Sequence, residues 1–128
     1  MNYFDAAVEA AGKIGIKEVS EDIYLGNAKR YAIVSVETEP EAFANDTPCA
    51  DRLYITIGVY VPIEENVRKW DKSFRLALEI AGLENIKRVG TTYEEKKRTR
   101  HIIYTAEMAE IREEKWQQSD YATWYQHH

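Results

Sequence analysis

The sequence predicts a single α+β domain, in which an antiparallel sheet of four or more strands carries two helices packed on one face. Three observations predict this class. Two segments place apolar residues at helical spacing, four others have the composition or the period-two alternation of strands, and loops rather than crossover helices join the neighbouring strands. At 128 residues the chain suits one core, which we place in residues 1–111, ahead of an aromatic-containing tail at residues 112–128.

The first element is a short amphipathic helix from Asn2 to Lys13, whose apolar residues recur at helical spacing. Asn2 is the expected N-cap, and Gly15 marks the point by which the helix should end. A short strand is then expected around Ile23 to Leu25, ahead of the turn signal Gly26-Asn27.

Two strands follow, from Arg30 to Thr38 and from Arg52 to Val61. The second alternates strictly, which predicts one buried face and an opposite face of tyrosine, threonine and glycine. The buried set is Leu53, Ile55, Ile57, Val59 and Val61. Between the strands, Glu39 to Ala50 is predicted as a loop, longer than the roughly 2 to 5 residues usual in hairpins and therefore a candidate for function.

The helical spacing of apolar residues next predicts a long helix from Ile63 to Ala81, closed by Gly82 in a left-handed cap. A hairpin ends the domain, with strands at Ile86 to Glu94 and Arg100 to Ile111 and a charged tip at Glu95 to Thr99. In its second strand one face is shared by Ile102, Tyr104, Ala106 and Met108.

Composition narrows the function. The formal net charge of -5 argues against a generic affinity for nucleic acid, which depends on lysine and arginine neutralising phosphates. The single cysteine, Cys49, excludes a disulfide framework within the chain and fits an intracellular setting. We expect neither export nor membrane insertion, because the start lacks the pattern of a secretory signal and the apolar runs are far shorter than the roughly 20 residues of a membrane-spanning helix.

Candidate chemistry is sparse in this sequence. Cys49 and His101 are a possible thiolate–imidazole pair, but no third orienting group accompanies them, and a loop cysteine and a strand-end histidine need no such role. The acidic residues 37, 39 and 41 read as a solvated strand end, and His127-His128 as a tail without a role. The basic cluster at residues 96–100 reads as a solvated hairpin tip. We therefore predict no enzyme, no cofactor and no metal.

One pattern of element order and residue type points to a family. It consists of a strand at Arg30–Val36, a loop with Phe43, Asn45 and Asp46, a strand at Arg52–Pro62, a helix at Ile63–Ala81, and a hairpin from Thr92-Tyr93-Glu94 to Arg100–Tyr104. Over about Tyr31 to Ile111 this pattern resembles the tail terminator, or tail-completion, proteins of long-tailed bacteriophages. The short N-terminal helix fits the same pattern.

The resemblance implies a structural protein of the virion tail or neck, assembled in the host cytoplasm. Such a protein forms a hexameric ring that caps the tail tube, ends its polymerisation and joins tail to head. The implied partners are copies of the chain itself, the tail tube protein and the head-side connector. The candidate interface residues are Phe43, Asn45, Asp46, Tyr54, Tyr60, Lys97, Arg98, Arg100, Trp116 and Trp124.

Two other readings remain open at this point. A small-molecule-binding regulatory domain of the same α+β architecture predicts an apolar pocket. A small hydrolase using Cys49 and His101 predicts a thiol with a lowered pKa.

Overall fold

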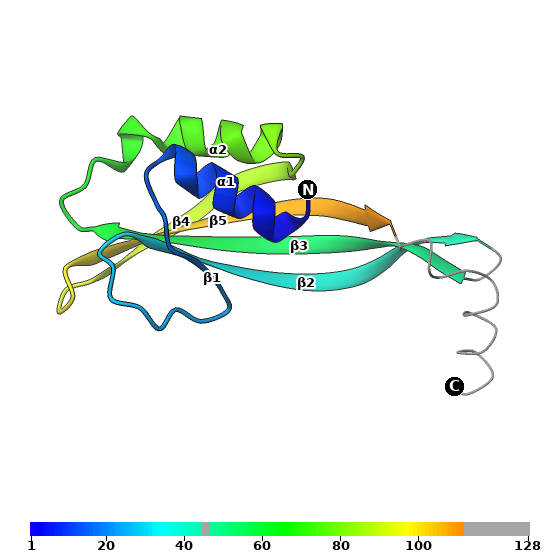
Figure 1. Cartoon of the computed structure of the whole chain (residues 1–128), viewed down its shortest axis with the longest axis horizontal. Helices are drawn as coiled ribbons and strands as arrows, with labels where there is room; N and C mark the ends of the chain where they lie inside the picture. The colour runs from blue at the N-terminus through cyan, green and yellow to red at the C-terminus, as the bar shows by residue number, and fades with distance from the viewer. Residues whose placement is uncertain (45–46, 112–128) are drawn as a thin grey trace.

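The computed structural model describes residues 1–44 and 47–111, with side chains for all of these except 41–44 and 47–49. Two helices lie over one face of a long, twisted sheet (Figure 1). The elements in order are α1 (Tyr3–Lys13), β1 (Val19–Glu21), β2 (Tyr31–Ala44), β3 (Thr47–Pro62), the 3-10 turn η1 (Val67–Lys69), α2 (Asp71–Ile80), β4 (Glu84–Glu94) and β5 (Thr99–Ile111).

The described strands form one sheet in the order β1-β2-β3-β5-β4. Every pairing is antiparallel except that of β1 with β2, which is parallel. The predicted α+β class, with two helices on one face of a largely antiparallel sheet, is confirmed, and β1 makes the sheet a mixed one. The parallel edge arises because residues 22–30 run back along the sheet before β2 begins.

The strand predicted around Ile23 to Leu25 is wrong by a few residues, since β1 ends at Glu21. Asp22 has a positive φ of 64°, a conformation in which a strand does not continue. The backbone of Asp22 then donates to the carbonyl of Val34, and Ile23 and Leu25 are exposed beyond this bend. Ile23 and Leu25 therefore belong to a loop rather than to a strand.

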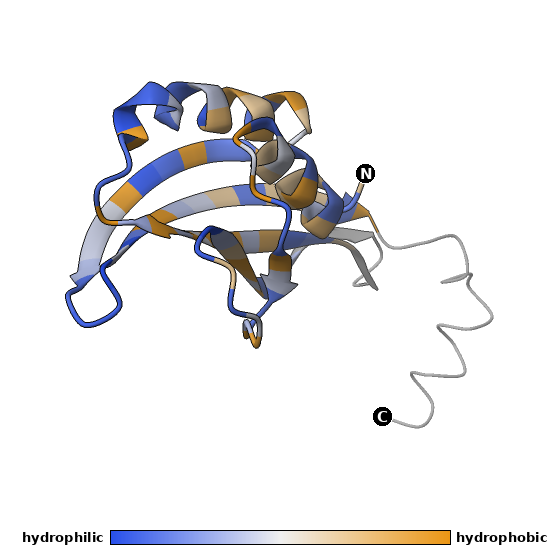
Figure 2. Cartoon of the chain, turned by 60° about the vertical axis from the view of Figure 1, so that its left-hand side comes forward, coloured by the Kyte–Doolittle hydropathy of each residue, from blue (hydrophilic) through white to orange (hydrophobic). Residues whose placement is uncertain are grey.

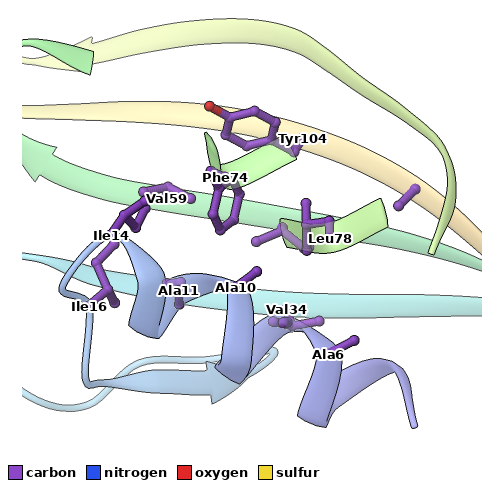
Figure 3. Packing of buried hydrophobic residues seen from close by; sticks show 14 of the residues in the cluster. Ala6, Ala10, Ala11, Ile14, Ile16, Val34, Val59, Phe74, Leu78 and Tyr104 are labelled. Carbon is purple, nitrogen blue, oxygen red and sulfur yellow. The ribbon is translucent and has the colours of Figure 1, made fainter. Parts of the chain in front are cut away.

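The core lies between the helices and the sheet, as Figure 3 shows for Phe74, Leu78, Val59 and their neighbours. The face of β3 predicted from the period-two alternation is confirmed, because all five of its apolar residues are buried. The same holds for Ile102, Tyr104 and Ala106 of β5, with Met108 packed at the edge of the cluster. From α1 the core receives four alanines, whose small side chains let the helix lie close to its neighbours.

The predicted ends of α1 are confirmed. Asn2 accepts a hydrogen bond from the backbone N–H of Asp5 at 2.8 Å, which satisfies one of the free donors of the first turn. Gly15 follows the helix with a φ of +79°, a conformation that favours glycine.

The second helix is shorter than predicted, because it begins at Asp71 rather than at Ile63. Glu65 accounts for the difference. Its carboxylate accepts two hydrogen bonds from Arg30, at 2.8 and 3.0 Å, and one from Nε1 of Trp70 at 2.8 Å. These contacts tie the segment before the helix to the start of β2. The predicted cap at the other end is confirmed, with Gly82 at a φ of +104°.

The loop predicted from Glu39 to Ala50 is also wrong. β2 continues to Ala44 and β3 begins at Thr47, with Glu39 opposite Arg52 and Phe43 opposite Pro48 after two register shifts. Pro40 of β2 and Pro48 of β3 both lie where a strand has a neighbour on one side only: β1 pairs β2 no further than Val34, and β5 pairs β3 no further than Ala50. Proline is tolerated at such edges.

The ends of β2 and β3 form what we call the arm, residues 40–44 and 47–51, which extends past both helices (Figure 1). At the opposite end of the sheet, β4 and β5 are joined by the predicted charged turn at residues 95–98, called the tip below.

Candidate interaction surfaces

Helices cover only one face of the described sheet, and the opposite face is called the open face here (Figure 1). Because strand side chains alternate, the open face carries the residues that lie between the buried positions of β3, namely Arg52, Tyr54, Thr56, Gly58 and Tyr60. The open face has three distinct regions, which are an aromatic stack near the tip, a basic cleft at the tip, and an acidic region near the arm.

Four aromatic rings stack across the strands near the tip. Tyr24 lies on Tyr31 with ring centres 4.0 Å apart, Tyr31 on Tyr60 at 4.6 Å, and Tyr60 on His101 at 4.1 Å. Interplanar angles of 10 to 13° make these true stacks. The row joins the loop before β2 to β2, β3 and β5, so that it fastens that loop to the sheet.

The stack depends on a glycine in the middle of β3. A Cβ built on Gly58 would lie 2.5 Å from Nε2 of His101, closer than real Cβ atoms come. The imidazole therefore occupies the place that a side chain at position 58 would take. A glycine inside a strand weakens it in general, and here the weakening is offset by the ring that packs over it.

Burial favours the neutral forms of Tyr31, Tyr60 and His101. It raises the pKa of Tyr31 and of Tyr60 above the ordinary value, with a smaller contribution from the charge of Glu94 to each. Burial also lowers the pKa of His101, because the charged imidazolium loses hydration there. At neutral pH these three rings thus form an uncharged, semi-apolar strip.

The tip is held against the turn that follows β3. The carbonyl of Arg98 accepts from the backbone of Ile63 at 2.9 Å, and Nη2 of Arg100 donates to the carbonyl of Ile63 at 2.8 Å. The guanidinium of Arg100 lies 5.6 Å from the ring centre of Tyr93. The positive φ of Arg98, 50°, allows the tight turn. Arg100 therefore stabilises the hairpin of its own subunit.

A cleft opens beside the tip, and the turn at the tip is coloured as hydrophilic in Figure 2. Its lining includes Tyr24, Lys29, Tyr31, Glu64, Lys97 and Arg98. Arg98 and Glu64 approach to 3.9 Å with both side chains more than 70% exposed, a separation and exposure at which an ion pair contributes little. The cleft combines an aromatic wall from the end of the stack with an excess of positive charge.

The region near the arm has the opposite charge. Glu37 and Glu39 are exposed on β2 and lie opposite Tyr54 and Arg52 of β3. Arg52 binds Glu107 at 3.1 Å and Glu84 at 3.4 Å. Hydrogen bonds from Asn85 and from Arg52 lower the pKa of Glu107 below its ordinary value, so that it stays ionised.

Apart from the open face, a further candidate surface lies on the helical layer. Met1, Leu76 and Ile80 are large apolar residues with 66, 52 and 78% of their surface exposed. They line a groove between α1 and α2, together with Ala77 and Ala81, and the groove's polar residues are Glu9, Lys13 and Ser73. Apolar exposure of this kind is typical of a contact surface when the residues are contiguous.

The structure places the predicted interface residues in separate regions. Tyr54 belongs to the acidic region, Tyr60 to the aromatic stack, and Lys97, Arg98 and Arg100 to the tip. Phe43 lies in the arm, where its backbone pairs with Pro48. Asn45, Asp46, Trp116 and Trp124 lie outside the described residues, as do His127 and His128.

The proposed pair of Cys49 and His101 is wrong in this fold. His101 pairs with Tyr60 of β3, and Cys49 lies eleven positions earlier on the same strand. At about 3.3 Å per residue the two positions are roughly 35 Å apart. A base at that distance cannot activate the thiol.

Among the residues that the structure describes, no cluster of three or more histidine, cysteine or acidic side chains is arranged to hold a metal ion. Neither described helix has the length and hydropathy to cross a membrane.

Sequence reasoning missed the stack itself. Tyr31 and Tyr60 were visible at the ends of two strands on the same face, and an isolated glycine at 58 is a known mark of close approach by another group. Their meaning required the register, which brings Tyr31 opposite Tyr60 and Tyr60 opposite His101. Nothing in the sequence identified Tyr24 as the fourth ring, because residues 22–30 carry no periodic pattern.

A scan of the chain against models of protein families finds no match, and a search of curated proteins finds none either.

Proposed function

We propose that this chain is a structural assembly protein of a bacteriophage tail, which forms a homo-oligomeric ring at the end of the tail tube, ends tube polymerisation and joins the tail to the head. The family resemblance of residues 31–111 suggests this role. The arm is the observation that carries it.

Among the described residues, the outer part of the arm has no further strand beside it. β5 supports β3 only as far as Ala50, so that the pairing of residues 42–44 with 47–50 is two-stranded at its end. An isolated two-stranded hairpin is at best marginally stable in water. A second chain that covers the arm would supply the missing contacts, as is common where a strand pair projects from a subunit.

Two further features favour a ring over a simple pair. A closed ring uses heterologous contacts, in which one patch of a subunit meets a different patch on the next. The arm and the tip lie at opposite ends of the sheet (Figure 1), and the tip carries the basic residues Lys96, Lys97 and Arg98. The exposed outer edge of β4 is a further surface available for strand pairing.

Electron microscopy of tail tubes tests the proposal. Tubes from the phage that carries the gene, prepared without this chain, are expected to vary in length and to end bare. Added chain should appear as a ring at one end of each tube and should stop its growth. Tubes that keep growing, with the chain unbound or bound along their sides, would overturn the proposal.

The groove between α1 and α2 favours the alternative of a small-molecule-binding domain, because its volume, about 690 Å³, lies within the usual range of ligand sites. Thermal denaturation in the presence of a library of small apolar carboxylates and amines would test it. A stabilising compound whose effect disappears in Leu76→Ser would support this alternative, and no stabilisation by any compound would count against it.

A further inference from the structure

Charge is divided between the two ends of the sheet. Near the arm, the charged residues of β2, β3 and β5 are acidic except for Arg52; they are Glu37, Glu39, Asp51, Glu107 and Glu110, with Glu41 adding a further acid in sequence. We call this region the acidic end. At the tip, Lys96, Lys97 and Arg98 follow Glu94 and Glu95, and Lys29 lies across the cleft from them.

The two ends cannot meet within one subunit. The pair Glu39 and Arg52 belongs to the acidic end, and the pair Pro62 and Thr99 closes the sheet at the tip. The roughly ten residue steps along β3 from Arg52 to Pro62 span roughly 33 Å at about 3.3 Å per residue. Their complementary charges can therefore be brought together only between molecules.

We propose that the acidic end of one subunit docks into the cleft beside the tip of a second copy of this chain, in a head-to-tail order that repeats around an assembly. This inference rests on the self-association in the proposed function and adds the surfaces that meet. The cleft's volume, about 530 Å³, is sufficient to receive several side chains of a docking partner.

The chemistry of the cleft suits this partner. Lys29, Lys97 and Arg98 supply positive charge at its edges, and Tyr24 and Tyr31 supply apolar and aromatic surface. Glu64 is the cleft's acidic residue, and Arg98 is its nearest cation. Charges of this kind, exposed at the edge of an interface, orient two molecules and speed their encounter. Facing Glu37 and Glu39, they favour the docking of unlike ends and disfavour the docking of like ends.

A charge-swap experiment tests the contact by sedimentation velocity of the full chain at low ionic strength. The acidic-end variant carries Glu37→Lys and Glu39→Lys, and the cleft variant carries Lys29→Glu and Lys97→Glu. The wild type should form species larger than a dimer, and each variant should associate roughly tenfold more weakly, because two exposed attractions become repulsions. Combining all four substitutions in one chain should restore association, as should an equimolar mixture of the two variants.

The matched control reverses two charges in the helical layer, with Lys72→Glu and Glu79→Lys on the exposed side of α2. It should associate like the wild type, and circular dichroism of every variant should show a folded chain. Sodium chloride at about 0.5 M should weaken wild-type association, because the Debye length then falls to about 4 Å.

Several results would overturn the contact. They are a wild type that remains monomeric or stops at a dimer, variants that associate as well as the wild type, and a fourfold variant that fails to recover. If the variants lose association yet tubes are not capped by wild type, the contact stands and the proposed function fails. If tubes are capped equally by wild type and variants, the proposed function stands and the contact fails.

Discussion

At Gly58 the open face of the sheet has no side chain, and the imidazole ring of His101 lies where a Cβ would be. Exposed positions on this face, such as Tyr54 and Thr56, are expected to tolerate exchange because their side chains face solvent. Position 58 does not, since the ring above it is itself confined between Tyr60 and the strand. The absence of a side chain at Gly58 therefore makes room for His101, and with it for the row of stacked rings that fastens residues 22–30 to the sheet.

Gly58→Ala is expected to lower the free energy of unfolding by roughly 1 to 3 kcal/mol, the usual cost of forcing extra volume into a packed site. Urea denaturation measures it. Gly90→Ala is the matched control in β4, where the nearest atom to a new Cβ is 4.0 Å away, and it should change little. Adding His101→Ala to Gly58→Ala should remove most of the extra cost, and strictly additive effects would show that the ring and the glycine are not coupled.

His101 gives the fold a dependence on pH. Its folded pKa lies below the ordinary value of 6.5 because burial disfavours the charged ring, so that the unfolded chain binds the proton more readily. Its contribution to stability is thus complete above a pH of about 6.5 and declines as the pH falls toward the folded pKa. Urea midpoints at pH about 7.5 and about 5 should differ less in His101→Gln than in the wild type. An equal difference in both proteins would exclude His101 as the cause.

The alternation of β3 was predictable to the residue, because burial on one face and exposure on the other impose a period of two. The positions of the rings on the open face were not. Tyr31, Tyr60 and His101 meet through strand pairing between residues distant in sequence, and that register follows from the packing of the other face. Local sequence patterns therefore do not predict this register.

The start of α2 is held by a network of polar contacts to Asp71, the first residue of the helix. The buried hydroxyl of Tyr104 donates to Oδ1 of Asp71 at 2.5 Å, Arg75 donates to the same carboxylate at 3.2 Å, and Arg88 lies 3.6 Å from it. Burial and then this hydrogen bond raise the pKa of Tyr104 above its ordinary value, so that the hydroxyl keeps its proton. The network joins the helix to β4 and β5.

Asp71→Ala is expected to cost more stability than Tyr104→Phe, roughly 2 to 4 against about 1 to 2 kcal/mol. The first change leaves the hydroxyl of Tyr104 buried without an acceptor and removes an acid from the first turn of a helix, whereas the second leaves Asp71 paired with its arginines. Arg75→Ala, which breaks a partly exposed pair within the helix, should cost about 0.3 to 0.5 kcal/mol and is the control. Urea denaturation of the three variants decides the order, and equal losses would contradict it.

The boundaries of elements were harder to predict than their existence. The helix predicted from Ile63 begins at Asp71 because Glu65 binds Arg30, a residue far away in sequence. Residues 39–50 were predicted to be a loop, and the sequence does not show that Pro40 and Pro48 lie where a strand has a neighbour on one side only, a place at which proline is tolerated. In both cases a tertiary contact, or the absence of a neighbouring strand at that point, overrode a local signal.

Taken as a whole, the described part of the molecule is an elongated sheet with its core in the middle and the proposed contact surfaces at the ends. The described core reaches along β2 to Val36 and along β3 from Leu53, so that the arm lies beyond it. A subunit built in this way can fold through its centre and use its ends for assembly. Stability and assembly should accordingly respond to different substitutions.

Removal of the arm separates the two properties. Replacing residues 40–51 with Asn-Gly joins Glu39 to Arg52, which already lie opposite each other, through a turn that suits a two-residue hairpin. The free energy of unfolding should change by less than about 1 kcal/mol, because every residue of the described core remains and shorter loops cost less entropy to close. Capping of tail tubes, seen by electron microscopy, should be lost.

A matched change at the other end of the sheet replaces residues 96 and 97 with Asn-Gly. It keeps the arm and removes Lys97 from the cleft, so that it should weaken association between subunits while leaving the fold intact. An arm-deleted chain that unfolds would show the arm to be part of the folding unit, and one that still caps tubes would show that the ring contacts them through another surface.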